Sequence, residues 1–257
     1  MHPKLAAVID LLLNGATFWW MPQLESWYWF GLWFLIRVVL WGLFIRLVYY
    51  PKELSRWRHF FSLVFFNFGV VISLLIFIEW KLSWYLLSLI FVFFSSVSFW
   101  LLPVGEDKLL IFSKPYRRWL FLMDAFGLAG FWSGIYAFLS FQLIPHNLFW
   151  LMSLAGAGVT TLISAWWWRA YGLEYTNRFW LSLIACFVLT FELAAVVWTW
   201  PLGYLANGII IIWFWYNWWL IIRFNLTKEG IDWKKQRLFL GFNFSLLIIF
   251  LFLVRWR

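Results

Sequence analysis

The sequence predicts an all-α polytopic integral membrane protein, and two observations carry that prediction. Hydrophobic residues make up 65% of the 257-residue chain and charged residues only 12%, whereas soluble domains are about 25% charged. The apolar residues also occur in blocks near 20 residues long, which is the length that crosses about 30 Å of hydrocarbon at about 1.5 Å per residue. A soluble chain with so few charges would have too little polar surface to cover its core.

Apolar runs between charged or turn-rich stretches predict about nine transmembrane helices. The count falls to eight if the first run lies at the membrane surface, because that run is short and contains Asp10 and Asn14. The predicted helices comprise residues 4–20, 26–48, 59–79, 83–102, 119–141, 147–168, 178–199, 203–223 and 238–254.

A repeat of about 60 residues supports the first helix. Arg58, Arg118, Arg178 and Arg237 are evenly spaced, and each opens an apolar run. The first three runs are each followed by a short break and a second apolar run, so the repeating unit is a helix hairpin. We therefore predict a single transmembrane domain, residues 1–257, built from hairpins at about 1–57, 58–117, 118–177 and 178–236 and a final helix at 237–257. Because each unit holds two helices, successive units keep one orientation, in contrast to inverted repeats.

The loop charges predict the orientation, because cytoplasmic loops of membrane proteins are enriched in Lys and Arg. The connections at 21–25, 80–82, 142–146 and 200–202 contain a single Lys or Arg residue, Lys81. The opposite set carries Lys52, Arg56, Arg58, Lys108, Lys114, Arg117, Arg118, Arg169, Arg178, Lys228, Lys234, Lys235 and Arg237. This pattern predicts a multi-pass protein of a plasma or bacterial inner membrane, with its N-terminus in the cytoplasm and its C-terminus outside.

The net charge of +9 therefore points to lipid rather than to nucleic acid. The basic residues lie in short loops and form no basic face on a soluble domain. The predicted partners are the lipid bilayer, with anionic headgroups on the cytoplasmic face, and other membrane subunits.

The 25 tryptophans predict aromatic belts, because the amphipathic indole ring settles at the headgroup level. Many lie at predicted helix ends, including the run Trp166–Trp168 beside Arg169. The competing interpretation of that run is a cage for a cationic ligand. A deeper minority is expected to pack between helices or to face lipid: Trp33, Trp41, Trp132, Trp213 and Trp215.

Ionisable residues inside predicted spans are the candidate functional residues, since each costs roughly 2.5–3.5 kcal/mol at mid-helix. Asp10 and Arg37 both lie roughly 15 Å below the same predicted surface. In an antiparallel hairpin they would meet as an intramembrane ion pair, which lowers the cost of burying either charge. Such a pair is a structural clasp for the first helix or, alternatively, a gate or proton site.

The remaining ionisable residues within spans differ in their expected partners. Arg46 is near a helix end and can extend to the surface. Asp124 is close enough to Arg117 and Arg118 to reach back towards them. Glu192 has no obvious partner at its depth. Glu192 and Asp124 are therefore the candidate coupling or substrate-contact residues.

Small residues in the central hairpin predict close helix packing. Gly127, Gly130 and Gly134 lie in one predicted helix, and residues 153–165 of the next are mostly small. Such spacing lets helix backbones approach closely. We expect the packing centre of the bundle here, with a dimer interface as the alternative.

The sequence offers no catalytic motif, and we predict no catalytic residue, metal or cofactor. His2, His59 and His146 lie far apart, and Cys186 is the single cysteine, so neither a metal cluster nor a disulfide is expected.

Three functional hypotheses remain. The favoured one is a non-catalytic membrane component, such as a scaffold or accessory subunit of an envelope assembly. The alternative is a transporter or channel for a small solute, ion or lipid that uses the intramembrane acids. The third is a lipid-modifying membrane enzyme with Glu106, Asp107 or His59 as acid–base groups.

Overall fold

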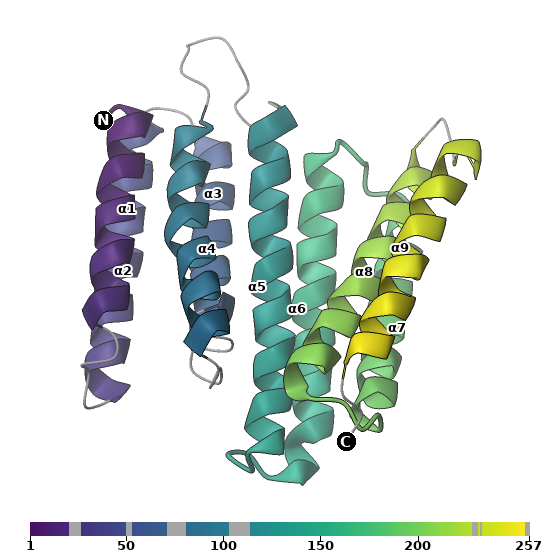
Figure 1. The fold of residues 1–257 in the computed structure, drawn as a ribbon. Helices are drawn as coiled ribbons and strands as arrows, with labels where there is room; N and C mark the ends of the chain where they lie inside the picture. Colours follow the sequence, from purple (N-terminus) through teal and green to yellow (C-terminus); the bar gives the residue numbers. More distant parts are fainter. Residues whose placement is uncertain are drawn as a thin grey trace. The chain divides into compact units, whose positions relative to one another are not determined.

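The computed structural model describes residues 1–20, 27–49, 53–70, 81–102, 114–227, 231 and 233–254. These residues form nine α-helices and one short 3-10 turn, with no β-strand among them (Figure 1). The helices are α1 (Pro3–Trp20), α2 (Trp27–Val48), α3 (Glu53–Phe68), α4 (Lys81–Trp100), α5 (Lys114–Ser140), α6 (Phe149–Ala170), α7 (Asn177–Trp198), α8 (Tyr204–Leu226) and α9 (Trp233–Leu253), and the turn η4 (His146–Leu148) precedes α6. The all-helical class that the sequence predicts is confirmed for the described residues.

Six helical segments in the described part of the chain are long and apolar enough to cross a membrane, which makes this a membrane protein. They are Gly31–Val48, Pro115–Ser140, His146–Ala170, Asn177–Trp198, Tyr204–Leu226 and Gln236–Leu253. The helices α1, α3 and α4 are not among them. Helix α1 carries Asp10 and Asn14, α3 has 16 residues, and Trp84–Trp100 of α4 is a shorter apolar stretch within the described residues.

Three helices begin more than one turn before the predicted apolar runs, at Glu53, Lys114 and Trp233. The predicted boundaries follow the change from charged to apolar residues. A helix does not have to end there, because its backbone groups stay hydrogen-bonded within the helix whatever the side chains. Basic residues that the sequence assigns to loops, such as Arg117 and Lys234, therefore lie in first helical turns.

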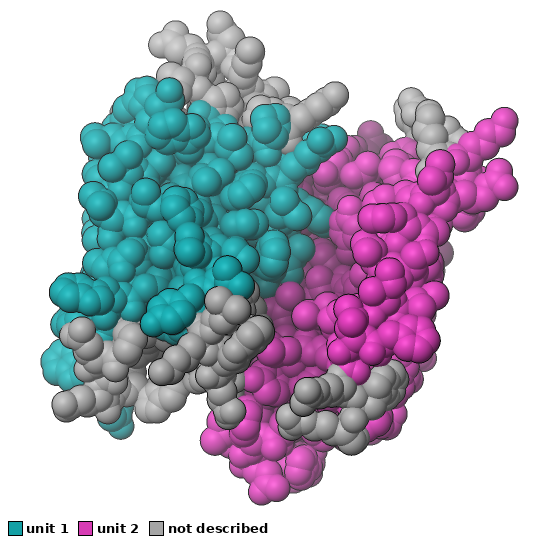
Figure 2. Space-filling view, viewed as in Figure 1, with its two compact units in different colours: residues 1–127 teal, residues 128–257 magenta. Residues whose placement is uncertain are grey.

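The chain forms two compact units, Met1–Gly127 and Leu128–Arg257, which are coloured separately in Figure 2. The division falls within α5. In unit 1, α1 packs chiefly against α4 rather than against its sequence neighbour α2. Aromatic rings fill the unit: Phe18 of α1 lies 4.8 Å from Phe91 of α4, and Phe34 of α2 lies 6.1 Å from Phe68 of α3 (ring centroids).

In unit 2, α7 packs against both α6 and α8. Buried hydrogen bonds tie its helices together: the Trp215 indole on α8 donates to Ser164 Oγ on α6 at 2.8 Å, and the Tyr136 hydroxyl on α5 donates to the Ala194 carbonyl on α7 at 2.8 Å. Helix α9 adds ring contacts to α8 through Phe239 and Phe244.

Close helix approach depends on glycines at three places in the two units. A Cβ on Gly127 would lie 2.7 Å from the Phe65 ring, and one on Gly156 would lie 2.7 Å from the Trp132 ring. A Cβ on Gly208 would lie 2.1 Å from Ser133 Oγ. Gly130 and Gly134 are both buried on α5. Gly156 lies in the stretch of small residues at 153–165 that predicts close packing, whereas Gly208 is a packing position that the sequence did not predict.

The tryptophan run at the end of α6 lies mainly inside unit 2. Trp167 and Trp168 are buried, and Trp166 is half-buried. Consecutive helical residues are about 100° apart around the axis, so three in a row cannot share one face. Trp168 Nε1 donates to the Trp219 carbonyl at 3.3 Å, which ties α6 to α8.

Candidate functional site: two buried polar clusters in unit 1

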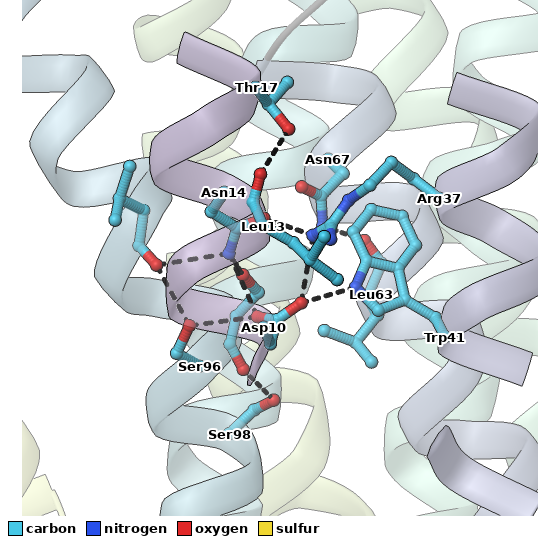
Figure 3. Close-up of polar contacts among 12 residues, drawn as sticks. Asp10, Leu13, Asn14, Thr17, Arg37, Trp41, Leu63, Asn67, Ser96 and Ser98 are labelled. Carbon is cyan, nitrogen blue, oxygen red and sulfur yellow. Dashed lines mark hydrogen bonds and ion pairs between the residues drawn. The ribbon is translucent and has the colours of Figure 1, made fainter. Parts of the chain in front are cut away.

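The first cluster, called the Asp10 cluster, surrounds a fully buried carboxylate on α1 (Figure 3). Arg37 Nη2 lies 2.9 Å from Asp10 Oδ1 and forms an ion pair with it, and Trp41 Nε1 donates to the same oxygen at 2.8 Å. The other oxygen, Oδ2, accepts from Asn14 Nδ2 at 2.9 Å and from Ser96 Oγ at 3.0 Å. Two donors on each oxygen fill the roughly four lone-pair sites of an ionised carboxylate.

Asn14, one turn after Asp10 on α1, connects the cluster to α4. Its amide nitrogen donates to Ser95 Oγ at 2.7 Å and to the Val92 carbonyl at 3.2 Å, and its oxygen accepts from Arg37. These bonds explain why α1 packs against α4: polar side chains on both helices have to meet, since each would otherwise be buried unsatisfied.

Arg37 completes the cluster from α2. Its guanidinium carbon lies 4.7 Å from the Trp41 ring centroid, in cation–π geometry, and the side chain is 3% exposed. Arg37 Nη1, a donor, and Oδ1 of Asn67 on α3, an acceptor, are among the buried atoms of unit 1 that have no hydrogen-bond partner within the described residues.

The second cluster, called the Tyr–His cluster, consists of Tyr49, His59, Ser98 and Tyr116, all buried. The Tyr49 hydroxyl contacts His59 Nδ1 at 3.0 Å and hydrogen-bonds to the Tyr116 hydroxyl, and His59 Nε2 contacts Ser98 Oγ at 2.7 Å. Burial raises the pKa of the Tyr49 hydroxyl, so Tyr49 is protonated at neutral pH. A neutral His59 that carries its proton on Nε2 satisfies every bond, since Nδ1 accepts and Nε2 donates.

The serines of α4 join the two clusters. Ser98 Oγ, which contacts His59, also donates to the Ser95 carbonyl, while Ser95 Oγ accepts from Asn14. The link between the clusters is Ser95 itself, because its carbonyl accepts from Ser98 of the Tyr–His cluster and its hydroxyl accepts from Asn14 of the Asp10 cluster. The sequence analysis missed these serines. The signal was the stretch Phe94–Phe99, FSSVSF, in which three hydroxyls interrupt an otherwise apolar run.

The other candidate residues lie in different surroundings. Asp124 on α5 is buried and accepts from Ser62 Oγ on α3 at 3.1 Å. Glu192 on α7 belongs to unit 2 and is exposed. Glu106 and Asp107 lie outside the described residues. The structure therefore brings Asp10 and Arg37 together. Asp124 bonds to Ser62 instead, and Glu192 belongs to the other unit.

The hydrogen bonds of the two clusters join neighbouring helices and hold each side chain in a fixed position. The four donors on Asp10 come from three helices, Asn14 on α1, Arg37 and Trp41 on α2 and Ser96 on α4, and so tie these helices together. His59 has both ring nitrogens engaged and no exposed surface, so it lies out of reach of a substrate at the membrane surface. Among the described residues, no three His, Cys, Asp or Glu side chains gather closely enough to hold a metal ion.

The chain matches no protein-family model, and the searches of curated proteins and of solved structures found no similar chain.

Proposed function

We propose that this chain is a non-catalytic multi-pass membrane component, a scaffold or accessory subunit of an envelope assembly, with nine spans and a cytoplasmic N-terminus. The observation that carries the proposal is the saturation of Asp10. The chain's own donors fill both carboxylate oxygens, so this intramembrane charge holds α1, α2 and α4 together and offers no open position to a solute.

The energetics agree with a clasp. A buried ion pair offsets its desolvation only when further hydrogen bonds satisfy the remaining lone pairs. Trp41, Asn14 and Ser96 supply those bonds. Helix α1 carries two polar residues in its middle, Asp10 and Asn14, and the clasp binds both of them to α2 and α4.

Contact with anionic lipid is part of the proposal. Arg46 lines a groove with Gly42 and Ile45 of α2 and Trp57 and Phe60 of α3. Basic pockets between helices on the cytoplasmic side are suited to anionic headgroups. The groove places a cation beside exposed aromatic surface, at the end of α2 that the loop charges predict to be cytoplasmic.

A second candidate, transport of a proton or small ion, is supported by one specific observation. Arg37 Nη1 and Asn67 Oδ1 are buried without a partner within the described residues, and a bridging water would satisfy both by accepting from Arg37 and donating to Asn67. From Arg37, hydrogen bonds through Asn14 lead on to Ser95 Oγ of α4.

Reconstitution into lipid vesicles separates the two candidates. Purified protein is inserted into vesicles that contain a pH-sensitive dye, and proton flux is measured under a pH gradient, with potassium flux measured in parallel. A scaffold predicts the same leak as protein-free vesicles for the wild type and for Asp10→Asn. Flux in the wild type that Asp10→Asn abolishes, while Glu174→Gln at an exposed loop position leaves it intact, would establish the transport function instead.

A further inference from the structure

The outward face of α7 carries a carboxylate among apolar side chains. Leu181, Ile184, Val188, Glu192 and Val196 are all exposed and recur every three or four residues, so they form one stripe. The opposite side is buried, and it contains Phe179, Leu183, Cys186, Thr190, Ala194 and Val197. Helix α7 therefore uses its buried face to pack within unit 2 and presents Glu192 on the other.

Glu192 lies deep enough to face hydrocarbon. It precedes Trp198, the last residue of α7, by six positions, or about 9 Å along the axis. The helix is among those long and apolar enough to cross a membrane. Among the described residues the Glu192 carboxylate has no hydrogen bond or ion pair, and an unpaired carboxylate at such a depth is one of the most unfavourable placements in a bilayer. Asp10, by contrast, has four donors.

We propose that the stripe of α7 centred on Glu192 docks a transmembrane helix of another subunit, which carries a lysine or arginine at matching depth. This inference rests on the proposed function as a subunit of an assembly and names the surface that such an assembly would use. Apolar neighbours on both sides of Glu192 supply the packing surface, and the carboxylate selects a partner that brings a cation.

Charge complementarity favours this occupant over the others. A second copy that docked through the same stripe would bring Glu192 against Glu192, and like charges repel strongly in a low-dielectric medium. Arg37 of a second copy is unsuited as the cation, because it is buried and already paired with Asp10. Anionic lipid would place phosphate against carboxylate.

A synthetic helix tests the proposal. Two leucine-rich peptides of about 20 residues carry one lysine about six residues from one or the other end, so that one of them matches the depth of Glu192. A third peptide carries leucine throughout. All three lack tryptophan and bear a dansyl acceptor. Energy transfer from the 25 native tryptophans to dansyl in vesicles then reports association without labelling of the protein.

The expected result is that the depth-matched lysine peptide associates about 5- to 30-fold more tightly than the leucine peptide. Glu192→Leu should abolish that preference, and Glu174→Gln, at an exposed position in the loop before α7, should retain it. Glu192→Leu should also fold normally, because leucine suits a lipid-facing position.

Several results would overturn the proposal. Equal association of the lysine and leucine peptides with the wild type shows that the stripe does not select a cation. A lysine preference that persists in Glu192→Leu shows that another residue is responsible. Loss of folding in Glu192→Leu shows that the carboxylate is bound within its own chain. Vesicle flux tests the proposed function separately, so either idea can fail while the other stands.

Discussion

A double-mutant cycle at Asp10 and Arg37 tests whether the Asp10 cluster acts as a clasp. Asp10→Asn removes the negative charge, and Arg37→Met removes the positive charge while keeping most of the side-chain volume. Each single variant leaves one uncompensated charge in a site where Asp10 is 0% and Arg37 3% exposed. Removing one partner of a buried pair costs about 3–5 kcal/mol, and that is the expected loss for each single variant.

The double variant should lose less than the two single losses together. With both charges absent, what remains is the loss of a few neutral hydrogen bonds, each worth about 0.5–1.5 kcal/mol. The cycle should therefore give a coupling energy between Asp10 and Arg37 of at least about 2 kcal/mol, towards the upper end for groups in direct contact.

The free energy of unfolding is measurable in mixed lipid–detergent micelles by titration with sodium dodecyl sulfate, followed by circular dichroism. Glu174 and Arg178 are both exposed and provide a matched control cycle, Glu174→Gln with Arg178→Met, whose effects should add to within about 0.5 kcal/mol. Additive losses at Asp10 and Arg37 would refute the clasp, because independent effects mean that neither charge depends on the other.

The same unfolding titration checks three further predictions. Gly156→Ala should lose about 1–3 kcal/mol by overpacking, since its Cβ would lie 2.7 Å from the Trp132 ring, whereas Gly158→Ala, with open space around it, should be neutral or stabilising; equal effects would contradict the packing argument. Trp215→Phe should lose about 0.5–1.5 kcal/mol with its hydrogen bond to Ser164, and an unchanged stability would contradict that role. His59→Phe should lose about 1–3 kcal/mol by leaving buried hydroxyls without their partner; a stable variant would show that the Tyr–His cluster does not support the fold.

The depth of Asp10 and Arg37 in the membrane could be predicted from the sequence. The rise per residue fixes how far Asp10 and Arg37 lie from their helix ends, and equal depth on antiparallel helices makes contact possible. It does not fix the direction in which a side chain points around the helix axis. That rotation is set by packing against neighbouring helices. The participation of Ser95 and Ser96, and the packing of α1 against α4, follow from rotation and so could not be derived from spacing.

The same distinction between depth and rotation applies to aromatic and histidine residues. His59 is the first residue of a predicted apolar run, and its ring faces inwards and is fully buried. Trp167 and Trp168 are at the end of α6, where depth favours a belt, but their faces of the helix are covered within unit 2. Helix existence was predictable because apolar runs near 20 residues have few alternatives.

The direction in which the side chain points also distinguishes the three acids that lie within predicted spans. Asp10 faces inwards and has two donors on each oxygen, and Asp124 is buried with Ser62 as a donor. Glu192 faces outwards, among residues that suit lipid. An ionisable group in that position costs roughly 2.5–3.5 kcal/mol, and nothing described in the chain offsets it. Leucine at this position would let the helix span the bilayer without that cost. Glu192 is therefore the acid whose presence calls for a group from outside the chain, and its charge specifies the chemistry of that group.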